Sequence, residues 1–128
     1  MSKILTIEHR PIRLPSADLC SPRLTHRKLD AGYCRMCRRE ARVRPLTRHH
    51  LVPESWFLRQ PLPLRMIRNA HANIVPLCRP CHDRIDCRDI VERSQARREL
   101  RRSLTQQEIT FAIQVRSRAW LDYEYPRI

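Results

Sequence analysis

The sequence predicts an α+β fold in which a β-hairpin and a helix form a small core, flanked by a basic N-terminal arm and by C-terminal helices. Two Cys-x2-Cys pairs bracket the segment that holds both expected strands, and a helix-capping motif opens an apolar-periodic segment near the C-terminus. The 128 residues suffice for one domain with appendages. We divide the chain into an arm at residues 1–30, a central domain at 31–93 and a C-terminal helical segment at 94–128.

The arm is expected to be irregular. Pro11, Pro15 and Pro22 interrupt its basic and apolar residues, and proline removes a backbone donor wherever it stands. A single glycine, Gly32, precedes the first cysteine pair, where a tight turn requires a permissive backbone. The central domain therefore begins at this turn.

Two short apolar segments are expected to pair as a hairpin. The first strand is predicted over residues 46–53, where Pro53 ends it, and the second over 73–77. A further strand is expected at 41–44. Residues 54–72 form a connection that is long for a hairpin, and such loops are usually functional or disordered.

Two helices are expected after the hairpin. The first opens at Pro80, since proline is tolerated in a first turn, and runs to about Arg93, because the chain has no further proline until Pro126. The second begins at Thr105, where Thr-Gln-Gln-Glu forms a capping box. Its apolar residues recur at helical spacing: Ile109, Phe111, Ala112, Ile113, Val115 and Trp120.

The charge of the chain predicts a nucleic-acid partner. The net charge is +13, with 26 Lys plus Arg against 13 Asp plus Glu. All of these basic residues except Lys3 and Lys28 are arginines, whose planar guanidinium suits bidentate phosphate contacts. A membrane partner is not expected, because no stretch pairs Trp or Phe with a clean basic face. No apolar run reaches signal-peptide or membrane-helix length, so we expect a cytosolic protein.

Four cysteines in two chelating pairs predict a structural metal site. Paired thiolates at this spacing form a closed tetrahedral Zn²⁺ site without an open position. In a cytosolic protein the pattern indicates metal rather than disulfides. Such a zinc would tie the chain before the first strand to the helix after the second, whereas Cys20 and Cys87 are expected to be buried or incidental thiols. The four predicted ligands are Cys34, Cys37, Cys78 and Cys81.

Histidine and asparagine residues lie at the hairpin and the following helix. His49 and His50 are adjacent on the first strand, Asn73 opens the second, and His82 follows the last zinc cysteine. A His-His pair alone indicates ordinary polar surface. Neighbouring strand residues point to opposite faces, so both imidazoles can serve one site only where the strand bends or ends, which Pro53 favours. Together with Asn73, His82 and the zinc bracket, the pair indicates an active site.

This set of residues resembles the His-Asn-His (HNH, or ββα-metal) endonucleases, especially small bacterial and phage members with a four-cysteine zinc site. The resemblance spans about residues 34–86. It includes the Asn-x8-His spacing from Asn73 to His82 and the stretches Leu-Thr-Arg-His-His-Leu-Val-Pro and Val-Pro-Leu-Cys-Arg-Pro-Cys-His. It implies a hydrolase that cleaves DNA phosphodiester bonds and leaves a 3′-hydroxyl and a 5′-phosphate.

The resemblance also assigns roles. His50 is the general base that deprotonates the attacking water, His49 and His82 hold one divalent cation (Mg²⁺, Mn²⁺, Ni²⁺ or Zn²⁺), and Asn73 positions the active-site loop. An ordinary imidazole accepts protons near neutral pH, and a cation stabilises charge that develops on phosphate. Asp86 stands where the family often carries another histidine. Asp86 could be a third metal ligand, or it could orient His82 from the outer shell. An ordinary surface aspartate is about as well supported.

Arginines near the motif are candidate phosphate contacts, namely Arg48, Arg79 and Arg84. Three other histidines, His9, His26 and His71, have no motif context and are expected at the surface.

Two alternatives to a nuclease are open. One is a non-catalytic, zinc-stabilised module that binds nucleic acid by charge. The other is a phage packaging accessory protein that acts through its C-terminal helix, and whose partner is a packaging (terminase) complex. The nuclease is favoured because His49, His50, Asn73 and His82 occur together. We expect DNA as the partner in the cytoplasm of a bacterium or a phage-infected host, with no membrane and no small-molecule cofactor.

Overall fold

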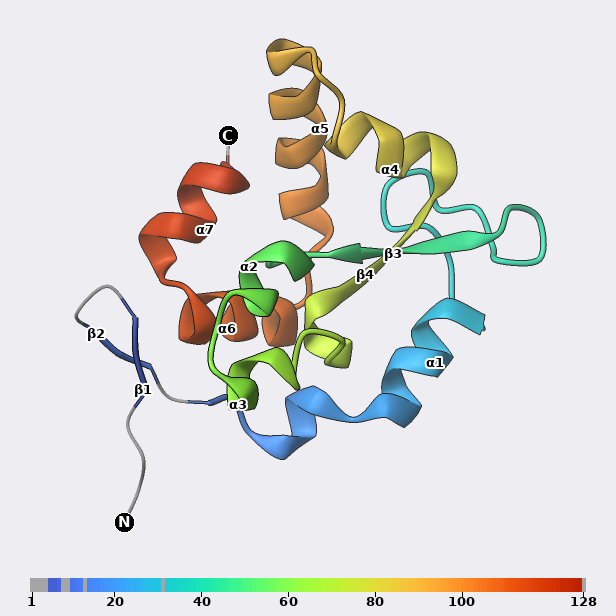
Figure 1. Ribbon diagram of the computed structural model, residues 1–128. Helices are drawn as coiled ribbons and strands as arrows, with labels where there is room; N and C mark the ends of the chain where they lie inside the picture. Colours follow the sequence, from blue (N-terminus) through green and yellow to red (C-terminus); the bar gives the residue numbers. More distant parts are fainter. Residues whose placement is uncertain (1–4, 8–9, 13, 31, 128) are drawn as a thin grey trace.

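A computed structural model describes residues 5–7, 10–12, 14–30 and 32–127. It confirms the α+β class: a two-stranded antiparallel sheet lies at the centre and short helices pack around it (Figure 1). The buried apolar core continues from this sheet into the C-terminal helices. Within the described part of the chain, no helix has the length and apolar character needed to cross a bilayer.

The predicted hairpin is confirmed. β3 (Leu46–His50) pairs antiparallel with β4 (Ile74–Cys78). Pro76 lies opposite Arg48 in this ladder, and its carbonyl accepts a hydrogen bond of 3.1 Å from the backbone N–H of Arg35. The first strand is shorter than predicted, because the backbone leaves the ladder after His50.

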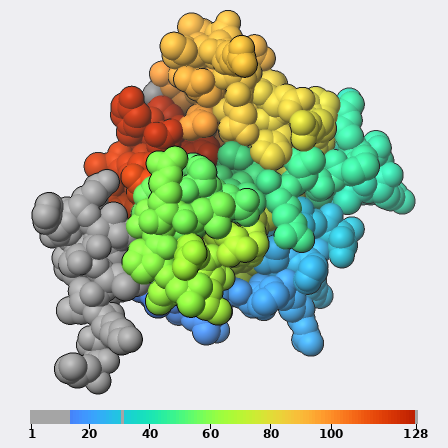
Figure 2. All heavy atoms as spheres, in the orientation of Figure 1, coloured from blue at the N-terminus to red at the C-terminus, as the bar shows by residue number. Residues whose placement is uncertain are grey.

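The connection between the strands is not a loop. It folds into α2 (Glu54–Leu58), α3 (Leu62–Arg65) and the 3-10 turn η2 (His71–Asn73). A proline occupies the N-cap position of both α2 and α3, where its missing N–H costs nothing. Pro53, which was expected only to end the first strand, therefore also caps the start of a helix. Figure 2 shows these segments together, in green, over one face of the molecule.

The helix predicted from Pro80 to about Arg93 is two helices. α4 (Arg79–Ile85) ends at Asp86, and α5 (Ile90–Ser103) begins after Asp89. The Asp89 carboxylate accepts a hydrogen bond of 3.0 Å from the backbone N–H three residues on. This N-cap favours a new helix start over continuation of the first.

The capping box at Thr105 is confirmed. Thr105 Oγ1 accepts from the Glu108 N–H at 3.2 Å, and the Glu108 carboxylate accepts from the Thr105 N–H at 2.8 Å. The apolar period that follows belongs to two helices, α6 (Gln106–Val115) and α7 (Arg118–Glu124). The break lies at Ser117, whose side chain caps α7. A single long C-terminal helix is therefore wrong.

The first 30 residues are more ordered than predicted. The strands β1 (Leu5–Ile7) and β2 (Arg10–Ile12) pair antiparallel, and η1 (Ala17–Cys20) and α1 (Pro22–Asp30) follow. Pro22 again occupies a first helical turn. α1 packs against η2 and the central hairpin. The domain division at residues 30 and 93 stays a prediction.

The cysteine-bearing turn departs from two expectations. Its left-handed residue is Arg38, with a φ of 67°, and not the glycine. Gly32 is required for another reason: a Cβ atom there would lie 2.1 Å from the carbonyl oxygen of Lys28. The predicted strand at 41–44 is absent, because these residues form turns.

A buried carboxylate joins three parts of the fold. Glu108 on α6 is fully buried and accepts two hydrogen bonds from Arg35, at 2.7 and 2.9 Å, and one from Lys28 on α1 at 2.7 Å. Burial alone would raise the pKa of Glu108, but Arg35 and Lys28 lower it below its ordinary value. Lys28 also donates to the carbonyl of His71, whose ring is buried and not at the surface as expected.

Replacing Glu108 with glutamine is expected to lower the free energy of unfolding by about 3–5 kcal/mol, because it leaves two buried cations without their carboxylate. Urea denaturation at neutral pH measures this loss, with Glu40→Gln as an exposed control. Since the folded-state pKa is depressed, the contribution is present above the unfolded pKa and is lost as pH falls through the folded one. A difference between wild type and Glu108→Gln that persists unchanged into acid would contradict this assignment.

Candidate metal centres and active site

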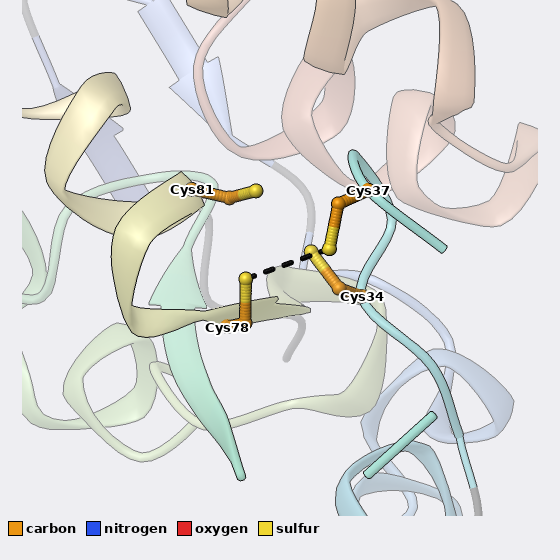
Figure 3. Close-up of side chains that lie close together, drawn as sticks. All are labelled: Cys34, Cys37, Cys78 and Cys81. Carbon is orange, nitrogen blue, oxygen red and sulfur yellow. Dashed lines mark hydrogen bonds between the residues drawn. The ribbon is translucent and has the colours of Figure 1, made fainter. Parts of the chain in front are cut away.

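The four predicted cysteines come together in one cluster (Figure 3). Two come from the turn before β3, one from the end of β4 and one from the first turn of α4. Their sulfur atoms lie within 4.8 Å of one another, and the Cys37 and Cys78 sulfurs are 3.6 Å apart. Tetrahedral zinc with Zn–S bonds of about 2.3 Å separates its sulfurs by about 3.8 Å. The cluster therefore fits a closed structural zinc site.

Within this cluster the surroundings of Cys78 favour a thiolate, whereas burial raises the pKa of the Cys37 and Cys81 thiols. Burial would raise the pKa of the Cys78 thiol, but hydrogen bonds from Cys81, and from Arg44 at 3.9 Å, lower it to about 6. The thiolate is the form that binds metal. Cys20 and Cys87 lie outside the cluster, as expected.

A second cluster joins the hairpin to α4. It contains His49 from β3, His82 from α4 and Asp86 at the C-cap of α4, and their ligand atoms lie within 4.8 Å of one another. His82 Nε2 is 3.5 Å from the Asp86 carboxylate. Two imidazoles and one carboxylate form a common donor set for a divalent cation that keeps open positions. Asp86 thus lies where a third ligand would stand, and its role as a ligand stays a prediction.

A threonine hydroxyl sets the proton position on His82. Thr47 Oγ1 donates its only hydrogen to the Leu77 carbonyl at 2.7 Å, so at 2.6 Å it accepts from Nδ1–H of His82. Nε2, which faces Asp86, then carries the lone pair that a cation requires. Burial lowers the pKa of His82 although Asp86 opposes this, which favours the neutral ring.

His49 is held from the opposite end of the chain. Its Nε2 lies 2.8 Å from the hydroxyl of Tyr125, which follows α7. Only 5% of His49 is exposed, and burial, with the nearby His82 and Arg97, lowers its pKa to about 3. The ring is therefore neutral at neutral pH, the form that binds metal.

His50 ends β3 beside this cluster. Its Nε2–H donates to Asn69 Oδ1 at 2.9 Å, because a carbonyl oxygen can only accept, and Nδ1 is left with the lone pair that a base requires. The Glu54 carboxylate lies 3.6 Å from Nε2. Because the strand ends here, His49 and His50 border one pocket despite being neighbours.

Asn73 anchors the turn that follows His50. It is fully buried; its Oδ1 accepts from the Val52 N–H at 2.8 Å, and its Nδ2 donates to the carbonyls of Val52 and Arg68 at 3.1 and 2.9 Å. All of its hydrogen-bonding groups are used in holding backbone. This geometry fits a positioning role.

His49, His50 and His82 line one pocket of about 580 Å³. One wall comes from the hairpin and α4, and the other from the C-terminal segment, which sequence reasoning did not connect to the site. Arg116 in this wall lies over the rings of Trp56 and Trp120, at 4.8 and 5.1 Å from their centres. The C-terminal wall consists of Arg97, Arg116, Trp120, Glu124 and Tyr125.

The three candidate phosphate contacts differ in position. Arg48 lines the pocket. Arg79 pairs with Asp83 at 3.2 Å, and Arg84 donates to Glu99 at 3.1 and 3.4 Å; neither lines it. Among the remaining histidines, His26 is exposed as expected, and His9 lies outside the described residues.

A hairpin and helix bracketed by four cysteines, with a second donor cluster between them, fit the ββα-metal class of domain. Residues 34–86 match the family described as HNH endonuclease, which confirms the resemblance inferred from the sequence. No curated protein and no solved structure matches the chain. The matched segment contains both donor clusters and the central hairpin. The C-terminal wall of the pocket lies outside it.

Proposed function

We propose that this protein is a metal-dependent DNA endonuclease that hydrolyses phosphodiester bonds. The observation that carries the proposal is the convergence of His50 with His49, His82 and Asp86 at one pocket, within the segment that matches the HNH family. A module that only binds nucleic acid needs charge, but no base beside an open donor set. The net charge of +13 supports a polyanionic substrate.

Two metals have different roles in this proposal. Zinc in the four-cysteine cluster is structural, since four thiolates leave no position for substrate. A single divalent cation, such as Mg²⁺, Mn²⁺, Ni²⁺ or Zn²⁺, is held by His49, His82 and Asp86. There it supplies Lewis-acid stabilisation of the charge that develops on the scissile phosphate. With one carboxylate and two neutral imidazoles, the donor set leaves about half of the ion's formal charge uncompensated for the phosphate.

The side chains around the pocket have the other catalytic and positioning roles. His50 accepts the proton of the attacking water at Nδ1, while the hydrogen bond from Nε2–H to Asn69 fixes its ring. Asn73 holds the turn after His50, and therefore the position of the base. Arg48 contacts a phosphate of the bound strand. The products carry a 3′-hydroxyl and a 5′-phosphate.

Supercoiled plasmid is expected to be nicked or linearised in the presence of Mg²⁺, Mn²⁺ or Ni²⁺ and to stay intact in EDTA. His82→Ala should lower the rate by more than the roughly 10- to 100-fold that loss of an outer-shell partner typically costs, because it removes a ligand itself. Zinc content and DNA affinity should remain those of wild type, since the cysteines and the basic surface are unchanged. Intact plasmid with every metal would refute the nuclease, and parallel loss of zinc in His82→Ala would refute the separation of the two sites.

A further inference from the structure

The two metal-site histidines are held in the same way by hydroxyl groups. Thr47 donates to the Leu77 carbonyl and accepts from Nδ1–H of His82. The Tyr125 hydroxyl donates to the carbonyl of Leu51 at 3.4 Å, so its hydrogen bond of 2.8 Å with His49 Nε2 is one that it accepts. This leaves His49 Nδ1 with the lone pair.

Tyr125 is itself fixed in place. Only 2% of it is exposed. The Arg97 guanidinium lies over its ring at 5.2 Å. Arg97 also bonds Glu124 at 2.7 Å and lies 3.7 Å from the Asp86 carboxylate. The same arginine therefore contacts the tyrosine that holds one proposed ligand and the carboxylate of another.

We propose that Tyr125 is a positioning residue for the catalytic cation, and that it fixes the proton and the ring orientation of His49 as Thr47 does for His82. The inference rests on the proposed function of the His49, His82 and Asp86 cluster as a cation site. A ligating histidine usually donates its other ring N–H to an outer-shell acceptor that fixes its tautomer and orientation, and the Tyr125 hydroxyl is such an acceptor for His49. The C-terminal segment, outside the part that matches the HNH family, thus completes the metal centre.

Packing alone does not explain this tyrosine. Phenylalanine fills the same space, and it leaves no polar atom to satisfy inside the core. The only hydrogen bonds of the buried hydroxyl that the described residues show are those to His49 and Leu51. Tyr125→Phe therefore removes the proposed function of the residue and keeps its volume.

The experiment compares Tyr125→Phe with Tyr123→Phe, a matched control on the same segment whose residue is 82% exposed. Mn²⁺ is titrated into zinc-loaded protein, and the EPR signal of free Mn²⁺ gives its affinity without any cleavage. His82→Ala identifies the cation site in the same titration. We expect Tyr125→Phe to bind Mn²⁺ about 10- to 100-fold more weakly, with a changed EPR line shape of the bound ion. Tyr123→Phe should match wild type.

Cleavage kinetics give a second readout that a purely structural defect would not produce. The Mn²⁺ concentration for half-maximal cleavage should rise in Tyr125→Phe while the KM for DNA stays unchanged. Melting temperature and zinc content are measured on each variant, and assays are run where all are folded. Mn²⁺ affinity equal to wild type in Tyr125→Phe would overturn the inference, as would unchanged affinity in His82→Ala. Weakened Mn²⁺ binding in a protein that cleaves no DNA would support it and refute the proposed function alone.

Discussion

Replacing His50 with alanine is expected to reduce the rate of DNA cleavage by roughly 10² to 10⁴, the usual contribution of a general base. His50 is outside the donor cluster of His49, His82 and Asp86, so its removal leaves the cation ligands in place. It is half-buried at the end of β3 and is not among the residues of the hydrophobic core, so its replacement should leave the fold intact. Single-turnover cleavage at saturating metal isolates this chemical step.

The matched control for this substitution is His26→Ala, because His26 is exposed on α1 and does not line the pocket. His50→Ala should keep wild-type Mn²⁺ affinity, zinc content and DNA affinity. Turnover like that of wild type would remove His50 from the base role. A loss of Mn²⁺ binding would instead make it a ligand.

Cys34→Ser is expected to abolish cooperative folding of the protein. Structural zinc contributes about 10–16 kcal/mol of apparent free energy in small zinc domains, and a whole domain has a net stability of only about 5–15 kcal/mol. Cys34 is fully buried, and its cluster joins the turn before β3, the end of β4 and α4. Elemental analysis should find less than one zinc per chain, and circular dichroism should show loss of the sharp melting transition.

Cys87→Ser is the control for this experiment, since Cys87 lies outside the cluster. It should retain zinc and melt like wild type. If Cys34→Ser melted at the wild-type temperature, the cluster would hold no structural metal. An equal loss of stability in Cys87→Ser would point to a general sensitivity to thiol replacement.

The core of the site could be predicted because its signals are local. Each cysteine pair supplies one half of the four-cysteine cluster. The spacing of Asn73 and His82 leaves room for one short strand and the first turn of the following helix. The capping box at Thr105 likewise needs only four residues. Each pattern relates residues whose geometry is set by one turn or one ladder.

The parts of the fold and of the site that could not be predicted depend on contacts between residues far apart in the sequence. Tyr125 lies 76 residues from His49, and no local pattern distinguishes it from an ordinary helix-terminal tyrosine. The helix boundaries were missed where a side chain competes for the backbone, as Asp89 and Ser117 do. Prolines were taken as interruptions although three of them begin helices, because their effect depends on which turn they occupy.

Pro76, in the centre of β4, prevents this strand from pairing with a strand of another molecule. A two-stranded ribbon has two edges, and an edge that nothing covers is a template for a further strand and hence for aggregation. Pro76 has no N–H to offer, and its carbonyl, which faces away from β3, already accepts from the backbone of Arg35. The outer edge of β4 therefore lacks both a donor and an acceptor at its midpoint. A strand from a neighbouring chain cannot pair with β4 at this point. The outer edge of β4, which lies beside both donor clusters, is therefore closed to strand addition.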